Sequence, residues 1–155
     1  MPILNSQSLE YISRSVEQTR RAGMRLGSLL KLGDVICLVG ELGSGKTTFV
    51  QGIAAGWGSL DQVSSPTFVL VNVYRRPQDQ VLYHLDAYRL SGAREAEDLD
   101  LTSFIEKGPL VVEWADRISS ALPGENLRVH LRYIDLEQRD LVLSANGSHY
   151  QVLLE

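Results

Sequence analysis

Residues 40–47 read Gly-Glu-Leu-Gly-Ser-Gly-Lys-Thr and match the phosphate-binding loop pattern G-x-x-x-x-G-K-[ST] at each fixed position. In such a loop the glycines let backbone N–H groups converge on phosphates, the lysine reaches the β- and γ-phosphates, and the hydroxyl residue ligates Mg²⁺. Lys46 and Thr47 would take these roles. The loop therefore predicts a site for a nucleoside triphosphate, and a glycine-rich turn with a solvent-facing lysine is the competing interpretation.

The segments on both sides of this loop have the character that a phosphate-binding loop requires. Residues 35–39 form a short apolar run typical of a buried strand, and residues 47–55 are typical of a helix. The N-terminus of that helix would place about half a positive charge and free N–H groups beneath the phosphates. We therefore expect an α/β fold of the P-loop NTPase type, in which helices flank a central, mainly parallel sheet. The candidate nucleotide-binding residues of the loop and the first helical turn are Leu42, Gly43, Ser44, Gly45, Lys46, Thr47 and Thr48.

Composition limits the other functions that this chain could have. Its 155 residues, 44% hydrophobic and 22% charged, are ordinary for a globular protein, and we expect residues 1–155 to form a single domain of this type. The formal net charge of −4 gives no broad basic surface, so any contact with RNA is expected to be indirect. The single cysteine, Cys37, lies in the expected core strand, and neither a signal peptide nor a membrane span is visible. These features predict a cytoplasmic protein without a membrane partner.

Apolar patterns predict further elements on both sides of the loop. Residues 9–13 are typical of a short strand, and Ser15 with Gln18 has the spacing of a capping box that opens a helix through about residue 30. Residues 81–85 and 109–112 are expected to be strands. After residue 124, strand-like segments at 127–134, 141–143 and 150–154 predict an antiparallel C-terminal extension of the sheet. Three leucines are expected on the apolar side of the first helix: Leu26, Leu29 and Leu30.

Two carboxylates follow directly after predicted strands. Asp86 comes after residues 81–85, and Glu113 comes after residues 109–112. Ligands of open α/β sheets sit outside the carboxyl ends of the strands, and Mg²⁺ is often held by one or two carboxylates together with phosphate oxygens. Asp86 and Glu113 are therefore candidate metal ligands beside Thr47. Which of the two binds the metal directly stays open, and a capping or ion-pairing role is the alternative for each.

Three more residues near these positions have two interpretations each. Thr67 follows a proline in the loop after the predicted helix, where its hydroxyl could respond to the γ-phosphate or could satisfy local backbone groups. Trp114 could pack against a nucleotide or fill the core. We interpret His84 as a packed strand residue rather than a general base, because no partner at a motif spacing is visible.

Motifs of other nucleotide-binding classes are missing from the sequence. No N-K-x-D guanine-recognition motif occurs, and no D-x-x-G follows Thr67, so a GTPase of the Ras type is disfavoured. Residues 90–94 are similar to the signature of transport ATPases, but they follow Asp86 where that signature should precede it. ATP with Mg²⁺ is therefore the expected ligand.

Four segments follow one another along the chain: residues 40–48, residues 63–71 with Ser65-Pro66-Thr67-Phe68, residues 83–90 with His84, Asp86, Tyr88 and Arg89, and residues 112–114 with Glu113-Trp114. In this order they resemble the bacterial TsaE (YjeE) family. The resemblance implies a small P-loop ATPase that is needed to make threonylcarbamoyladenosine in tRNA, and it implies two protein partners, TsaD and its homologue TsaB. Glu41, Ala87 and Ala115 depart from the residues that are usual in the family, but none of these three differences removes a functional group that the expected chemistry requires.

The resemblance also implies roles for single residues. Lys46 and the loop amides would bind the phosphates, and Thr47 with Glu113 would hold Mg²⁺. Asp86 would contact the metal through water or position the attacking water, and Thr67 would belong to a switch. Lys46, Asp86 and Thr67 are thus the candidate catalytic residues.

Two further residues of the family pattern would complete the nucleotide site. Trp114 would lie near the nucleotide, and Arg139, in the C-terminal hairpin, would contact it. Since no arginine finger is identifiable, we expect slow ATP hydrolysis by the protein alone and faster hydrolysis with its partners. A P-loop kinase for small molecules and a non-catalytic adaptor gated by ATP are the alternatives.

Overall fold

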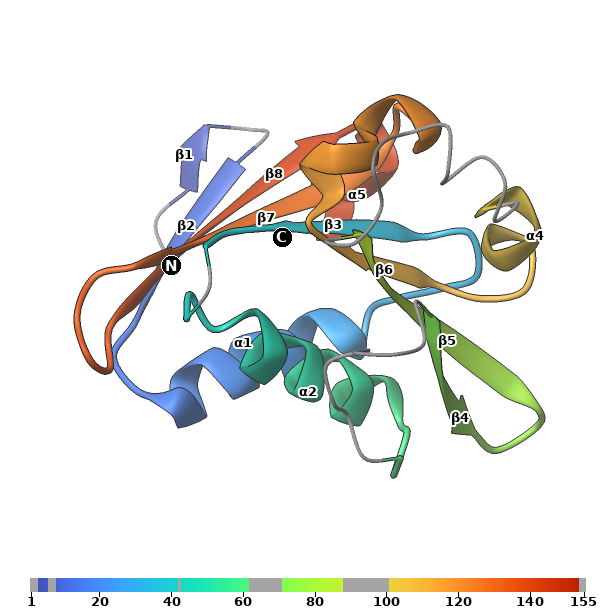
Figure 1. Cartoon of the computed structure of the whole chain (residues 1–155), viewed down its shortest axis with the longest axis horizontal. Coiled ribbons are helices and arrows are strands. Elements are labelled where there is room, and N and C mark those ends of the chain that lie inside the picture. Colours follow the sequence, from blue (N-terminus) through green and yellow to red (C-terminus); the bar gives the residue numbers. More distant parts are fainter. Residues whose placement is uncertain (1–2, 6–7, 42, 62–70, 88–100, 154–155) are drawn as a thin grey trace.

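The computed structural model describes residues 3–5, 8–41, 43–61, 71–87 and 101–153. Within these residues eight strands form one sheet in the order β1-β2-β8-β7-β3-β6-β5-β4 (Figure 1). The strands are β1 (Ile3–Asn5), β2 (Ser8–Ser13), β3 (Val35–Val39), β4 (Val71–Arg76), β5 (Gln80–Asp86), β6 (Leu110–Glu113), β7 (Asn126–Tyr133) and β8 (Arg139–Asn146). The helices are α1 (Val16–Gly27), α2 (Lys46–Trp57), α4 (Leu101–Ile105), the 3₁₀ helix η2 (Ala115–Ala121) and α5 (Ser148–Leu153).

The centre of the sheet is parallel and its two sides are antiparallel. β3 pairs in parallel with β6 and β7, and β6 pairs in parallel with β5. β4 lies antiparallel to β5, while β8 lies antiparallel to both β7 and β2. The expected α/β fold with a mainly parallel centre and an antiparallel C-terminal extension is confirmed.

Helices α1 and α2 cover one face of the sheet, and η2 packs on the other (Figure 1). Strand β3 is buried on both of these faces. Ile36 and Leu38 belong to the core under α1 and α2, whereas Val35 and Cys37 belong to the core under η2. Successive side chains of a strand point to opposite faces, so a strand buried on both faces must be apolar throughout. The uninterrupted apolar run of β3 is thereby explained.

Helix α1 begins where the capping residues predict. The Ser15 hydroxyl oxygen accepts from the Gln18 backbone N–H at 3.1 Å, and the Gln18 side chain accepts from the Arg14 N–H at 2.7 Å. The prediction that the helix continues to Leu30 is wrong, because α1 ends at Gly27 and a tighter turn follows, with Leu29 N–H bonded to Leu26. That turn leaves Leu29 44% exposed, so the prediction that Leu29 lies on the apolar side of the helix is wrong as well.

Helices α1 and α2 approach each other through glycines, which the sequence analysis did not anticipate. A Cβ added at Gly27 would lie 3.0 Å from the Ile53 Cα and still closer to the Ile53 carbonyl, and one at Gly52 would lie 3.1 Å from the Gly23 Cα. The two backbones therefore touch where larger side chains would separate them. A spacing of four residues between glycines on each helix, 23 with 27 and 52 with 56, was the available signal.

Residues 150–153 of the third expected segment of the C-terminal extension lie in helix α5 and not in a strand. Gly147 adopts a left-handed φ of +117° after β8, and its carbonyl accepts from the N–H groups of Tyr150 and Gln151 to start α5. The Tyr150 hydroxyl then accepts from the Val35 N–H at 2.9 Å. This segment covers the beginning of β3 instead of extending the sheet.

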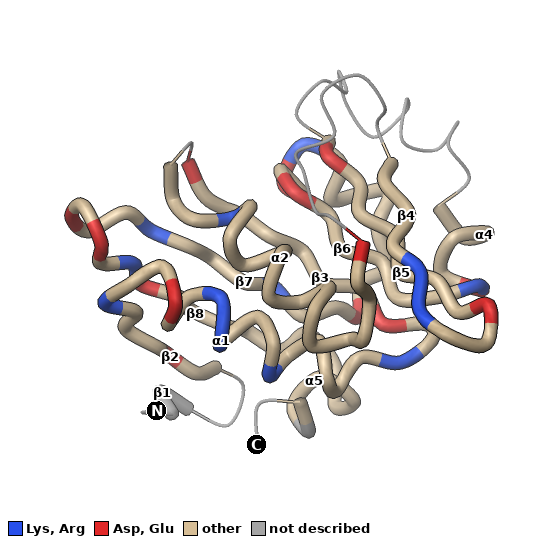
Figure 2. The backbone as a smooth tube through the Cα atoms, turned by 90° about the horizontal axis from the view of Figure 1, so that it is seen from below, with Lys and Arg blue, Asp and Glu red and all other residues tan. Residues whose placement is uncertain are grey.

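Positively and negatively charged residues are interspersed along the described backbone (Figure 2). Among the described helices, none is long and apolar enough to cross a membrane.

Candidate functional site

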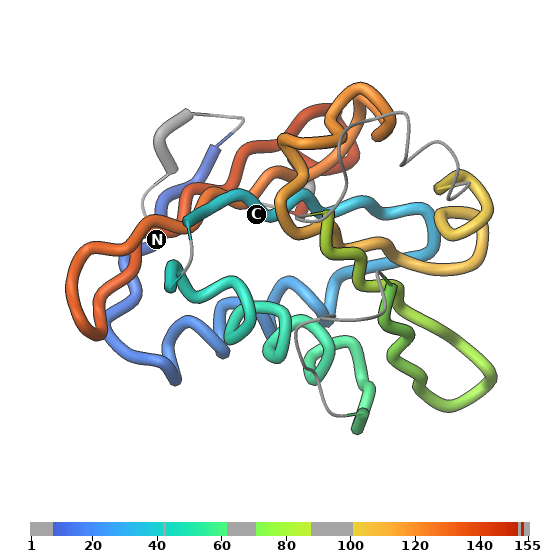
Figure 3. Tube along the Cα trace, viewed as in Figure 1, coloured from blue at the N-terminus to red at the C-terminus, as the bar shows by residue number. Residues whose placement is uncertain are grey.

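The glycine-rich loop joins the carboxyl end of β3 to the start of α2, at the centre of the sheet (Figure 3). Gly43 and Gly45 have φ values of +80° and +98°, which lie in the left-handed region that residues with a Cβ atom rarely adopt. The Gly45 carbonyl accepts from the Phe49 N–H at 2.9 Å, which opens α2. Glycine is therefore required by the backbone path at Gly45, a fixed position of the pattern, and also at Gly43.

Lys46 is folded back into this loop. Its Nζ donates to the carbonyl oxygens of Gly40 and of Glu41, the latter at 3.2 Å, and lies 4.1 Å from the centre of the Trp114 ring. Only 7% of Lys46 is exposed. Burial lowers the pKa of Lys46 from its usual value, and the nearby carboxylates of Glu113, Asp86 and Glu41 act in the opposite direction. The solvent-facing lysine of the competing interpretation is therefore wrong.

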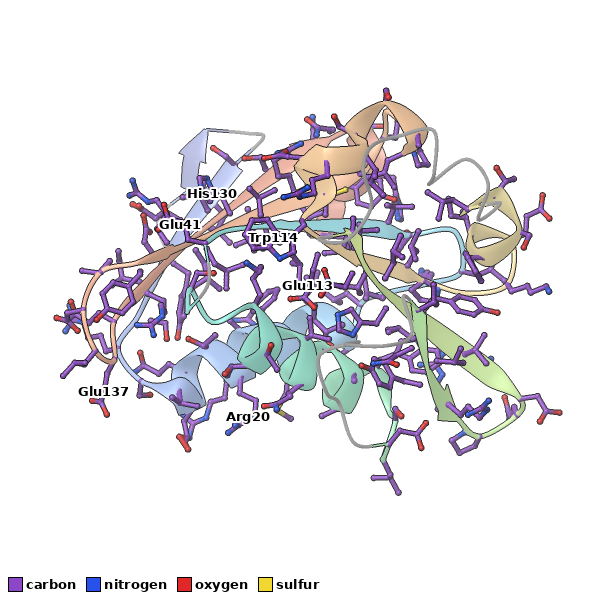
Figure 4. The ribbon with its side chains drawn as sticks, in the orientation of Figure 1. Arg20, Glu41, Glu113, Trp114, His130 and Glu137 are labelled. Carbon is purple, nitrogen blue, oxygen red and sulfur yellow. The ribbon has the colours of Figure 1, made fainter. Side chains whose placement is uncertain are left out.

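Trp114 is held over Lys46 by an unusual backbone conformation. Its φ of +58° lies in the left-handed region, which is uncommon for a bulky residue. Such conformations cost roughly 1–3 kcal/mol and cluster at functional sites. Figure 4 shows Trp114 close to Glu113 and Glu41 at the same edge of the sheet.

The two predicted carboxylates arrive at this edge as neighbours. Asp86 ends β5 and Glu113 ends β6, and the two residues are paired directly across these parallel strands. Glu113 also pairs with Leu38, just before the loop. Both carboxylates act on the Lys46 charge, so the structure brings Lys46, Asp86 and Glu113 together.

Glu113 is buried and has a partner that the sequence analysis missed. Its Oε2 lies 2.6 Å from His84 Nε2, and His84 Nδ1 lies 2.8 Å from the Tyr74 hydroxyl. The interpretation of His84 as merely a packed strand residue is therefore incomplete. No sequence spacing could reveal this contact, because the residues come from three different strands.

The hairpin between β7 and β8 packs against the other side of the loop (Figure 3). A Cβ at Gly45 would lie 3.7 Å from Arg139 Cγ, so Arg139 adjoins the loop. Arg139 Nη1 donates to the carbonyl oxygens of Asp135 and Gln138, at 2.6 and 2.8 Å, and the guanidinium lies 4.6 Å from the centre of the Tyr133 ring. Arg139 is thus close enough to contact a ligand in the loop, while that contact stays a prediction.

Unsatisfied polar atoms also gather at this loop. In the described part of the chain, four buried side-chain polar atoms lack a hydrogen-bond partner, and two of them, Ser44 Oγ and Arg139 Nε, border the loop. Buried polar groups are normally hydrogen-bonded, so orphaned donors and acceptors are consistent with a ligand that completes them. These atoms fit a phosphate group, which accepts from both.

The remaining predicted residues fall into two groups. Thr47 is exposed at the first turn of α2, where its hydroxyl can meet a ligand, and Thr48 is half-buried beside it. Leu42 and Thr67 lie outside the described residues, so their roles stay predictions.

A cavity of about 440 Å³ opens beside the loop, where β3 and β6 end next to His130 of β7. Its walls include Glu41, Trp114, Arg117 and His130. Figure 4 shows Glu41, Trp114 and His130 at this edge. No group of three or more His, Cys, Asp and Glu side chains that could hold a metal is present among the described residues. A metal here would rely on one or two protein ligands with phosphate and water oxygens, which suits Mg²⁺.

Comparisons with known proteins point to one family. The family model "Threonylcarbamoyl adenosine biosynthesis protein TsaE" matches residues 13–141. The proteins named "tRNA threonylcarbamoyladenosine biosynthesis protein TsaE" from Bacillus subtilis and Treponema pallidum are 36% and 37% identical to this chain. These matches cover 96% and 88% of this chain, and 93% and 100% of the respective relatives. A crystal structure of Bacillus subtilis YdiB has a TM-score of 0.78 at 30% identity, covering 96% of this chain and 92% of that one. The chain belongs to the TsaE family.

Proposed function

We propose that this protein binds ATP with Mg²⁺ at residues 40–48 and hydrolyses it in support of threonylcarbamoyladenosine formation in tRNA. The observation that carries the proposal is the enclosure of Lys46 between the loop carbonyls and Trp114, with Asp86 and Glu113 on the adjoining strand ends. A buried lysine with two carboxylates nearby is the constellation that triphosphate binding with a divalent cation requires. Relatives named for this tRNA modification supply the biological role.

Each residue has a distinct task in this mechanism. Lys46 leaves the carbonyls of Gly40 and Glu41 and donates to the phosphates instead, together with the N–H groups at the start of α2. The Thr47 hydroxyl and the Glu113 carboxylate would hold Mg²⁺, which when bound neutralises phosphate charge. Asp86, one strand away from Glu113, would orient the water that attacks the γ-phosphate.

Hydrolysis by the protein alone is proposed to be slow. Arg139, which adjoins the loop, has its Nη1 occupied by two backbone carbonyls. An arginine finger contributes roughly 10³- to 10⁵-fold to the rate when one is supplied, so a partner that supplies one would control the reaction. TsaD and TsaB are the proposed partners, and contact with tRNA would pass through them.

A small-molecule kinase is less well supported, because such enzymes close several arginines over the phosphates. Arg76 stacks 4.0 Å from the centre of the Trp57 ring and donates to the Trp57 carbonyl at 2.6 Å, at the far end of α2 from the loop. It is therefore committed to packing and cannot form a lid.

The decisive experiment combines ATP binding, hydrolysis and tRNA modification. The intact protein should bind ATP and restore modification to a mixture of TsaB, TsaD and the enzyme activity that supplies their substrate. Lys46→Ala should lose both. Glu106→Gln, an acidic residue beyond α4 and outside the proposed site, serves as the control. Normal ATP binding by Lys46→Ala would disprove the site assignment.

A second variant separates the ATPase from the adaptor. Asp86→Asn should still bind ATP but hydrolyse it far more slowly, and tRNA modification should fall with hydrolysis. Full modification by an Asp86→Asn protein that binds ATP without hydrolysing it would favour an ATP-gated adaptor instead. Equal and fast hydrolysis with and without TsaB and TsaD would exclude control by these partners.

A further inference from the structure

A line of hydrogen-bonded side chains crosses three strands and ends on Glu113. Tyr74 on β4, His84 on β5 and Glu113 on β6 are joined by contacts of 2.8 Å, from the Tyr74 hydroxyl to His84 Nδ1, and 2.6 Å, from His84 Nε2 to Glu113 Oε2. At the far end Asn72 Nδ2 donates to the Tyr74 hydroxyl at 3.4 Å. The line thus runs from the edge strand β4 to the candidate metal site.

Strand register makes this line possible. His84 is paired with Val111 and Asp86 with Glu113, so His84 reaches Glu113 diagonally across β5 and β6. Tyr74, paired with Leu82, reaches His84 diagonally across β4 and β5. Residues two apart on a strand share a face, and diagonal neighbours on one face are within reach of long side chains.

The donors of this line point toward Glu113. A carboxylate can only accept, so His84 Nε2 donates to Glu113, and in a neutral imidazole this leaves Nδ1 to accept from the Tyr74 hydroxyl. That hydroxyl in turn accepts from Asn72. A chain of hydrogen bonds with one direction polarises its members and strengthens the last bond.

Burial makes these bonds hard to replace by water. The side chains of His84 and Glu113 are 1% and 5% exposed, and Tyr74 is 2% exposed. A buried polar group that loses its partner is left unsatisfied, and a carboxylate without its donor can turn to a different rotamer. Because Oε2 is bound to His84, the orientation of the carboxylate and hence of Oε1 is fixed.

We propose that His84, itself held by Tyr74, is the positioning residue that orients Glu113 for the divalent cation. This inference rests on the proposed function, because it assumes that Glu113 binds Mg²⁺ together with ATP. Partners of this kind behind a metal ligand contribute roughly 10- to 100-fold to metal affinity. His84 acts only through Glu113 and touches neither the nucleotide nor the metal.

The test is the Mg²⁺ dependence of ATP binding, measured by calorimetry in EDTA and across a Mg²⁺ titration. His84→Leu should require roughly 10- to 100-fold more Mg²⁺ for half-maximal tightening of ATP binding, with unchanged affinity in EDTA. His84→Gln should restore much of the loss, because the glutamine amide nitrogen can take the place of Nε2. Tyr74→Phe should lie between His84→Leu and the intact protein.

The control is Leu127→Ala, a buried change in the same core on β7, where Leu127 pairs with Ile36 of β3. It should lower stability without changing the Mg²⁺ requirement. An unaltered Mg²⁺ requirement in folded His84→Leu, or equal losses in EDTA and in Mg²⁺, would overturn the positioning role. If His84→Leu does not fold, Tyr74→Phe takes its place in the test, and an unchanged Mg²⁺ requirement in Tyr74→Phe would overturn the role. An intact protein that binds no ATP under either condition would instead refute the proposed function.

Discussion

Gly52→Ala should destabilise the protein, although alanine is the better helix former. Gly52 lies in α2, where an added Cβ would lie 2.9 Å from the Arg20 carbonyl carbon and 3.1 Å from the Gly23 Cα, and closer still to the Arg20 oxygen. These neighbours are backbone atoms of α1, so they cannot turn aside as a flexible side chain could. The methyl group can fit only if the two helices move apart.

Two opposing contributions set the size of this effect. Replacing glycine by alanine inside a helix gains about 1 kcal/mol in helix propensity. Inserting a methyl group into a packed contact typically costs about 1–3 kcal/mol, and a backbone contact belongs at the upper end of that range. We therefore expect a net loss of about 1–2 kcal/mol. For a chain of this length each kcal/mol corresponds to about 2–4 °C in Tm, so Tm should fall by about 2–8 °C.

Thermal unfolding followed by circular dichroism measures this change, and urea unfolding gives the free energy directly. Gly124→Ala is the matched control, because its added Cβ meets no atom within 4 Å and its φ is not left-handed. It should leave stability unchanged or raise it by about 0.4–1 kcal/mol. A rise in Tm for Gly52→Ala would mean that propensity dominates and that α1 and α2 do not touch at this point.

Three other changes test separate features of the fold. Ser15→Ala removes the hydroxyl that caps α1 and should cost about 1 kcal/mol in thermal unfolding, whereas no loss would argue against the cap. Burial raises the pKa of Cys37 to about 11 from 9.0, so its thiol should resist alkylation at pH 8 until the protein unfolds, and rapid labelling of the native protein would contradict its burial. Because the pKa of Cys37 is higher in the folded state, its contribution to stability is complete below pH 9 and is lost as the pH rises from 9 to 11. In urea unfolding, Cys37→Ala should therefore reduce the decline in stability over this pH range. Tyr150→Phe leaves the buried Val35 N–H without its acceptor and should cost about 1–3 kcal/mol in urea unfolding, with an unchanged midpoint as the refuting result.

The sequence predicted those parts of the site whose geometry is set by a short stretch of chain or by the direction of a strand. Gly43 and Gly45 adopt left-handed backbone conformations that follow from the loop itself. Asp86 and Glu113 reach the same edge because strands that run parallel end on the same side of a sheet. Local bonding also explains the capped start of α1 at Ser15.

The predictions that failed depended on contacts between distant segments. Residues 150–153 are a sequence that suits either a strand or a helix, and in the structure they belong to α5, where the Tyr150 hydroxyl accepts from the distant Val35 N–H. The end of α1 and the exposure of Leu29 depend on how the chain turns toward β3. For Thr67 and Leu42, the sequence remains the only source of their predicted roles.

The sequence by itself determined that a loop with the phosphate-binding pattern lies between a core strand and a helix, since a run of eight residues carries the whole pattern. Only the tertiary structure decided how Lys46 is covered by Trp114 and how His84 holds Glu113. These contacts join residues that are many positions apart, and their geometry depends on strand register and on the packing of whole elements. Register and packing are set by the burial of the complete sheet, and no short stretch of sequence contains that information.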